Sequence, residues 1–118
     1  MTDCYYCTKP QHKFLIENDY AAGYYDEKPS SPGHFLVFTK RHTPDFFNMT
    51  REEQQGVNDL LVKAKELVDK EHQPAAYNMG ANCGSAAGQS VRHAHFHLIP
   101  RYEGDVENPK GGVRNIMK

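Results

Sequence analysis

The sequence lacks several features that would point to particular classes of protein. It has only 3 cysteines in 118 residues, an odd number that does not favour a disulfide framework. Its formal net charge is −1 and no basic cluster stands out, so we expect no nucleic-acid partner. Its apolar runs are far shorter than a membrane span, and the first ten residues do not form a signal peptide. These absences predict a cytoplasmic protein with no membrane partner.

A chain of this length is expected to form one domain, spanning residues 1–118. It is large enough to bury a single core, but small enough to gain stability from a partner subunit. The sequence shows no internal repeat, low-complexity segment or domain boundary. We therefore treat all of its motifs as parts of one unit.

Two of the cysteines are close together, as Cys4-x-x-Cys7. In a reducing compartment this spacing indicates metal or redox chemistry before it indicates a disulfide. The pair supplies only half of a zinc site. The third cysteine, Cys83, has no partner and is given no role, and His12 and His72 are expected to be solvated surface residues.

Short apolar and aromatic segments predict several strands. The predicted strands cover 12–18, 20–28, 34–40 and 75–80, with loops at 29–33 and 81–90. The segment 34–40, HFLVFTK, is a compact apolar run that is typical of a central strand. The polar, glycine-rich tail at 103–118 should be partly irregular.

The clearest helix begins after Thr50. Thr50 and Glu53 form a capping box, and two acidic residues lie in the first turn. Apolar residues then recur with a 3.6-residue period, so one face of the helix should pack on the sheet. These residues are Val57, Leu60, Leu61, Ala64, Leu67 and Val68. Because strands precede and follow this helix, which ends near Pro74, we expect an α+β fold with an antiparallel sheet.

Three histidines alternate with apolar residues in the segment SVRHAHFHLIPRY, residues 90–102. Strict alternation predicts a strand, because successive side chains point to opposite faces of a sheet. His93, His95 and His97 would then face a site, while Ala94 and Phe96 face the core. The rings span roughly 13 Å, which suits a phosphate and its neighbours.

The loop before this strand, ANCGSAAGQS, is rich in small residues that let backbone N–H groups approach an anion. A neutral imidazole is a good nucleophile at phosphorus, and a second one can protonate a leaving group. The alternation alone favours catalysis, but it is also compatible with a site that only binds a metal and, less so, with a structural role for the histidines.

Two stretches, PGHFLVFTKRH and GQSVRHAHFHLIPRY, strongly resemble the histidine triad (HIT) superfamily, whose signature is His-φ-His-φ-His-φ-φ with φ apolar. The resemblance covers nearly the whole chain. It implies an α+β HIT-like fold, with an antiparallel sheet of about five strands packed with one long helix and short helical pieces. It also implies a homodimer and hydrolysis or transfer at the α-phosphate of purine nucleotides.

The resemblance assigns roles to four histidines. His95, the middle one, matches the nucleophile that forms a nucleotidyl-histidine intermediate. His97 would contact the scissile phosphate and assist the leaving group, and His93 would orient the triad. His34, in PGH, matches the family's fourth, upstream histidine.

The resemblance also implies substrate contacts for four polar residues. Asn78, Gln89 and Ser90 fall where the family contacts phosphate. Asp26 falls where an acidic or amide side chain holds the ribose hydroxyls, and a carboxylate is a natural acceptor for a diol. Asp26 can equally be a plain turn residue and Asn78 a loop amide, so these alternatives stay open.

A subset of HIT proteins with Cys-x-x-Cys near the start completes a tetrahedral zinc site with two histidines. In this sequence the implied ligands are Cys4, Cys7, His42 and His93. Four protein ligands leave no open position, so the zinc would be structural. A reduced, metal-free thiol pair is the alternative.

The function implied is that of a nucleotide hydrolase acting on nucleoside phosphoramidates or dinucleoside polyphosphates. Two alternatives are a nucleotidyltransferase or phosphorylase, and a nucleotide-binding module with little activity. The uridylyltransferase branch has glutamine in place of the third triad histidine, whereas His97 is present here, which disfavours a transferase.

Overall fold

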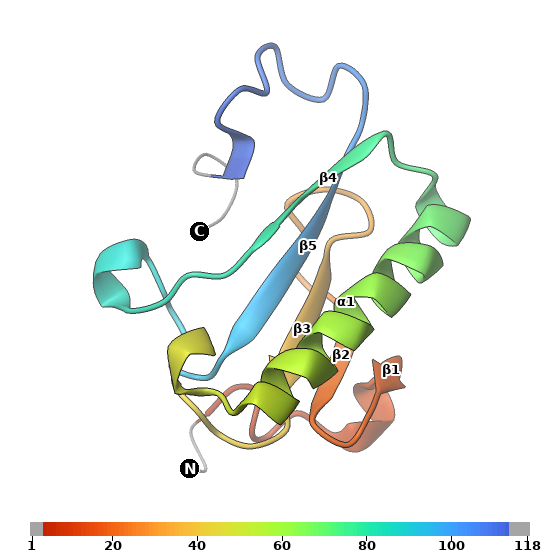
Figure 1. Cartoon of the computed structure of the whole chain (residues 1–118). Coiled ribbons are helices and arrows are strands. Elements are labelled where there is room, and N and C mark those ends of the chain that lie inside the picture. The colour runs from red at the N-terminus through yellow and green to blue at the C-terminus, as the bar shows by residue number, and fades with distance from the viewer. Residues whose placement is uncertain (1–3, 114–118) are drawn as a thin grey trace.

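The computed structural model describes residues 4–113, which form a five-stranded sheet with one long helix across it (Figure 1). The elements, in chain order, are η1 (Gln11–Lys13), β1 (Ile16–Glu17), β2 (Ala21–Tyr25), β3 (Phe35–Thr39), η2 (Phe46–Asn48), α1 (Arg51–His72), β4 (Ala76–Gly80), η3 (Ser85–Ala87) and β5 (His95–Arg101), where η denotes a 3-10 helix. All neighbouring strands are antiparallel, in the order β1-β2-β3-β5-β4. The predicted α+β class, antiparallel sheet and single long helix are confirmed.

The two N-terminal strands are shorter than the sequence predicts. Only Ile16 and Glu17 pair with β2, because the segment after Pro10 turns into η1 before it reaches the sheet. The strand predicted over 20–28 ends at Tyr25, because the Asp26 carboxylate accepts the Lys28 N–H at 2.9 Å and turns the chain. Aromatic content alone did not reveal these limits.

Helix α1 has the predicted N-terminus and packing face. The Thr50 hydroxyl accepts the Glu53 N–H at 3.1 Å, and the Glu53 carboxylate accepts the Thr50 N–H at 2.9 Å. The helix ends at His72, and its C-cap residue Gln73 has a left-handed φ of 46° directly before Pro74. Within residues 4–113, no helix combines the length and the apolarity that crossing a membrane requires.

The main core lies between α1 and one face of the sheet (Figure 1). The helix contributes its predicted apolar stripe, and the two central strands contribute alternate residues. The buried members from these elements are Val57, Leu60, Ala64, Val68, Phe35, Val37, Phe96 and Leu98. Alternation along β5 therefore directs its apolar residues to the core, as the sequence predicts.

The histidines of β5 face the other side of the sheet. His95 is opposite Phe38 and His97 is opposite Leu36 in the register between β3 and β5. Paired residues project to the same face, so the two rings lie beside a second, smaller apolar cluster that includes Tyr6. The sheet thus separates the core from the site.

His72 is not a solvated surface residue, as the sequence suggested, but is half-buried. Its ring packs on Tyr25, with 5.6 Å between ring centroids, and lies under Gly33. A Cβ on Gly33 would lie 2.9 Å from His72 Cδ2, and Gly33 has a φ of +89°. The last turn of α1 therefore supports the loop that leads into β3. In the tail, residues 103–113 are mostly turns, and 114–118 lie outside the described residues.

Candidate active site and candidate metal centre

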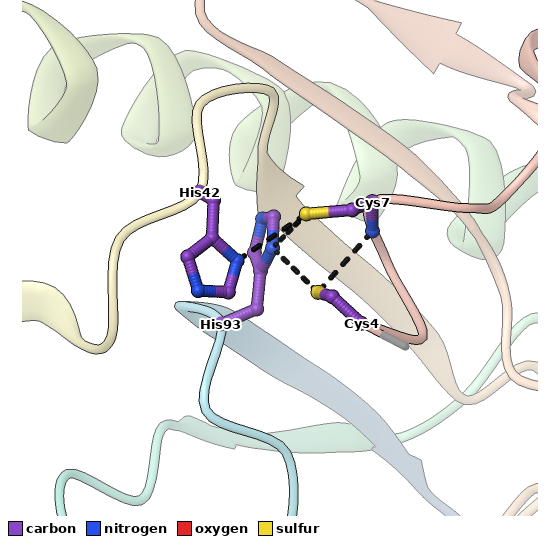
Figure 2. A group of neighbouring side chains, drawn as sticks. All are labelled: Cys4, Cys7, His42 and His93. Carbon is purple, nitrogen blue, oxygen red and sulfur yellow. Dashed lines mark hydrogen bonds between the residues drawn. The ribbon is translucent and has the colours of Figure 1, made fainter. Parts of the chain in front are cut away.

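The first functional cluster joins the N-terminal turn to the sheet (Figure 2). Cys4 and Cys7 come from this turn, His42 from the loop after β3, and His93 from the segment just before β5. Cys4 Sγ lies 3.2 Å and Cys7 Sγ 3.5 Å from His93 Nδ1, and Cys7 Sγ lies 3.2 Å from His42 Nδ1. Neither cysteine is in a disulfide.

These four side chains fit a tetrahedral metal ion. Their ligand atoms all lie within 4.8 Å of one another. With metal–sulfur bonds of about 2.3 Å and metal–nitrogen bonds of about 2.05 Å, a tetrahedron places S and N about 3.5 Å apart. The observed separations of 3.2–3.5 Å are close to this value. Two sulfur and two nitrogen donors in this arrangement are typical of zinc or iron sites.

The protonation of His93 also suits metal binding. Its Nε2–H donates to the Thr39 carbonyl oxygen at 2.6 Å, which leaves the Nδ1 lone pair directed at the two sulfurs. Desolvation and the neighbouring Cys4 raise the pKa of the Cys7 thiol to about 11. A cation is therefore needed to hold this sulfur as the thiolate at neutral pH.

The second cluster lines an open pocket of about 640 Å³ on the same face of the sheet. It combines two of the triad histidines with residues from the N-terminal turn, the segment after β2 and the loop before β5. The lining residues are Tyr5, Tyr6, Asp26, Glu27, Lys28, Leu36, Ser90, Val91, His95 and His97.

His95 presents a free ring nitrogen to this pocket. Its Nδ1–H donates to the His93 carbonyl oxygen at 2.8 Å, so Nε2 carries the lone pair. Burial lowers the pKa of His95 below its ordinary value, because the charged imidazolium is poorly solvated there. The ring is therefore neutral and able to act as a nucleophile at neutral pH.

A chain of hydrogen bonds fixes the opposite tautomer on His97. The Ser30 N–H donates to His34 Nδ1 at 3.0 Å, so His34 carries its proton on Nε2. This Nε2–H donates to His97 Nδ1 at 2.9 Å, which leaves the proton of His97 on Nε2. Among the described residues, the buried His97 Nε2 has no hydrogen-bond partner. Burial, with smaller contributions from His95 and His34, lowers the pKa of His97 to about 4.

Asp26 lies at the edge of this histidine chain. Its Oδ2 is 3.6 Å from His34 Nε2, and it lines the pocket. Asp26, His34 and His97 are close enough to hold a metal ion by distance alone. The Ser30 N–H, however, keeps the proton of His34 on the nitrogen that would have to bind the metal. We therefore describe this group as a hydrogen-bonded chain and not as a metal site.

The predicted phosphate-contacting residues are only partly brought together. Ser90 lines the pocket. The Gln89 side chain instead braces its own loop, because its Nε2 donates to the Pro44 and Val91 carbonyl oxygens and its Oε1 accepts the Gly84 N–H.

Asn78 lies in β4 and is not among the residues that line the pocket. Its Oδ1 accepts a hydrogen bond from Arg101 Nη1 at 2.7 Å. In the sheet, Asn78 is opposite Ile99, two residues beyond His97. The structure therefore places this amide against an arginine at the far end of β5.

Sequence reasoning missed Tyr6. Its ring is 5% exposed and packs on His95, with 5.0 Å between ring centroids. The only available signal was an aromatic residue inside the Cys4-x-x-Cys7 motif, because a turn that carries two metal-type ligands has to lie against the other ligands.

A family model described as HIT domain matches residues 8–104, which include both β3 and the histidine strand. The chain belongs to the HIT family. The family match confirms the resemblance to the HIT family seen in the sequence. Membership of the zinc-containing subset stays a prediction.

Several relatives and solved structures are similar to this HIT protein over most of its length. It is 38% identical over 105 residues to an uncharacterized HIT-like protein from Methanocaldococcus jannaschii, covering 88% of this chain and 81% of that protein. It is 34% identical over 85 residues to the asymmetrical bis(5'-nucleosyl)-tetraphosphatase of Schizosaccharomyces pombe, covering 72% of this chain and 47% of that protein. A solved structure of a HIT family protein from Bacillus anthracis gives a TM-score of 0.79 at 30% identity, covering 86% of this chain and 75% of that chain.

Proposed function

We propose that this HIT protein is a nucleotide hydrolase that acts at the α-phosphate of nucleoside phosphoramidates or dinucleoside polyphosphates. One observation carries the proposal: two neighbouring histidines face one pocket in opposite tautomers. His95 presents a bare Nε2, whereas the Nε2–H of His97 is buried beside the pocket with no partner among the described residues. A nucleophile and a hydrogen-bond donor for the charge that develops are what a two-step displacement at phosphorus needs.

In the first step, His95 Nε2 attacks the α-phosphorus. A P–N bond forms and the bond from phosphorus to the leaving oxygen or nitrogen breaks. His97 Nε2–H donates a hydrogen bond that stabilises the negative charge on the leaving group, which takes its proton from solvent, and His34 Nε2–H continues to hold the His97 ring through Nδ1. We expect Ser90, which lines the pocket, to stabilise the charge on the phosphoryl oxygens by donating a hydrogen bond.

In the second step, water cleaves the P–N bond of the nucleotidyl-histidine. The electron pair of the broken bond returns to His95 Nε2, the proton of the attacking water is released to solvent, and the nucleoside monophosphate leaves. His97 keeps its Nε2–H through both steps and stabilises the departing group by hydrogen bonding. Burial favours the neutral form of His95 that makes the attack.

Substrate binding is proposed from the pocket walls. The Asp26 carboxylate faces the pocket and suits a ribose diol as hydrogen-bond acceptor. Tyr5, Tyr6 and Leu36 supply apolar surface for a purine. The name of the S. pombe relative supports the dinucleoside polyphosphate branch. We keep phosphate-contacting roles for Gln89 and Asn78 only as hypotheses, because both side chains are bonded to protein groups.

We propose zinc as the ion for Cys4, Cys7, His42 and His93, because two thiolates and two imidazoles suit it. All four positions are protein ligands, so the metal would stabilise the fold and take no part in the reaction. We also propose a cytoplasmic location, since unpaired cysteines suit a reducing compartment. A homodimer is proposed from the resemblance to the family. Sedimentation of the zinc-loaded protein measures the dimer directly.

The test compares wild type with His95→Asn on a panel of adenosine phosphoramidate and diadenosine polyphosphates. We expect wild type to release AMP and His95→Asn to lose turnover by at least about 10⁴-fold. Nucleotide affinity, measured by calorimetry, should change little. Turnover by His95→Asn at the wild-type rate would refute the assignment of His95 as the nucleophile.

The same assay separates the alternatives. Reaction in H₂¹⁸O places ¹⁸O in AMP if water is the acceptor. Added phosphate gives ADP in its place if the protein is a phosphorylase. Nucleotide binding without any turnover of the panel would leave a binding module as the function.

A further inference from the structure

Tyr6 occupies the turn that carries half of the metal group. It stands between Cys4 and Cys7, and the Thr8 N–H closes this turn by donating to the Cys4 carbonyl oxygen at 3.1 Å. Tyr6 is 5% exposed, whereas its neighbour Tyr5 is 44% exposed. The turn that carries the two sulfurs therefore directs one aromatic ring inward.

The Tyr6 ring contacts both functional clusters. Its centroid lies 5.6 Å from that of His93, a metal-group residue, and 5.0 Å from that of His95, the proposed nucleophile. It also stacks on Phe38 at 4.9 Å with an interplanar angle of 27°. These separations lie within the range in which aromatic rings attract one another.

His95 depends on packing to hold its ring plane. Among the described residues its ring makes one hydrogen bond, from Nδ1–H to the His93 carbonyl oxygen, which restrains the ring at one atom and leaves the other edge to be held by packing. The Tyr6 ring is tilted by 33° from the His95 ring, and the His97 ring lies across it at 70°. Tyr6 and His97 thus flank the proposed nucleophile and limit the movement of its ring.

We propose that Tyr6 is a positioning residue through which a metal ion on Cys4, Cys7, His42 and His93 fixes the plane of the His95 ring. The ion sets the position of the turn, the turn sets the Tyr6 ring, and this ring sets His95 Nε2 relative to the pocket. The assignment of His95 as the nucleophile rests on the proposed function. The coupling itself is a physical property that can be measured without turnover.

The first test compares zinc-loaded Tyr6→Leu with wild type, Tyr6→Phe and the control Phe47→Leu, which removes a ring that is 77% exposed and outside the pocket. We expect the ¹⁵N ring signals of His95 to move towards tautomer averaging in Tyr6→Leu alone. With diadenosine tetraphosphate, Tyr6→Leu should lower kcat by about tenfold or more through misplacement of the nucleophile. Tyr6→Phe keeps the ring and should leave the His95 signals at their wild-type positions.

The second test replaces zinc by the larger Cd²⁺, which should shift the two sulfur atoms while the metal site stays occupied. The His95 signals should move on this exchange in wild type and Tyr6→Phe, but not in Tyr6→Leu. Such non-additivity is the signature of coupling through one residue.

Three results would overturn the proposal. These are unchanged His95 signals in Tyr6→Leu, an equal effect of Cd²⁺ in wild type and Tyr6→Leu, and a zinc content of Tyr6→Leu below that of wild type. In the last case Tyr6 would affect metal binding itself and would not transmit the effect of the metal to His95. If the signals behave as expected but no form turns over nucleotide, the coupling stands and the proposed hydrolase fails.

Discussion

At the scale of single residues, the three triad histidines hold their protons in different places because their partners differ. His93 donates from Nε2 to the Thr39 carbonyl oxygen, and His95 donates from Nδ1 to the His93 carbonyl oxygen. His97 receives the His34 Nε2–H on Nδ1. One residue type at every second position therefore presents three different arrangements of ring donors and acceptors.

The low pKa of His97 predicts how stability depends on pH. Burial lowers this pKa to about 4 in the folded protein, whereas the unfolded value is about 6.5. Between these values the unfolded chain binds the proton and the folded one does not, so the free energy of unfolding falls as the pH falls from about 6.5 to 4. Each unit of difference corresponds to about 1.4 kcal/mol.

The measurement is urea unfolding of wild type and His97→Gln at pH 7.5 and pH 5. Wild type should lose more stability than the variant over this interval. The groups facing His97 are His34 and His95, with Asp26 beside His34, and they stay the same in both proteins. Equal losses in the two proteins would contradict the assignment.

At the scale of elements, the N-terminus of α1 offers a separable test of stability. Replacing Thr50 by Ala removes the side chain that accepts the Glu53 N–H, and such caps contribute about 1 kcal/mol. Thr50→Ser keeps the hydroxyl and is the matched control. Thermal unfolding should show a lower melting temperature for Thr50→Ala only, with no change in KM, because Thr50 is not among the residues that line the histidine pocket. An unchanged melting temperature in Thr50→Ala would contradict this expectation.

The elements that the sequence predicts best are those whose side chains repeat with one period. Helix α1 has a 3.6-residue stripe and a capping box, and β5 has a two-residue alternation, so each pattern excludes the other structure. The short strand β1 has no such pattern. Its limits depend on where Ile16 and Glu17 meet β2, which is a long-range contact that local residues do not encode.

The site shows the same division. Cys4, Cys7, His42 and His93 come together as predicted, because a family motif relates their positions. Asn78 lies away from the pocket because the register of β4 against β5 decides its neighbour. The inward direction of Tyr6 depends on how the turn between Cys4 and Thr8 packs on Phe38 and His95, which are distant in the sequence.

At the scale of the whole molecule, the metal group ties the first turn to the segment just before β5, 89 residues later in the chain. Metal bound only by the folded state stabilises it by about 4 kcal/mol at a free concentration near 1,000 times Kd. We therefore expect Cys7→Ser, or chelation of wild type, to lower the melting temperature by more than about 10 °C.

Cys83→Ser is the matched control for Cys7→Ser, because Cys83 lies outside the metal group. It should keep both the bound metal and the wild-type melting temperature. Calorimetry with metal analysis of each protein checks both results. A metal-free Cys7→Ser protein as stable as wild type would show that the fold needs no ion.

Strand β5 has no spare side, because α1 covers the side reached by Phe96 and the histidine pocket opens on the side reached by His95. Inserting one residue after Phe96 would turn every later side chain of the strand to the opposite face, and would direct His97 into the apolar core and Leu98 into the pocket. A single extra residue here should therefore disrupt the core and the pocket together.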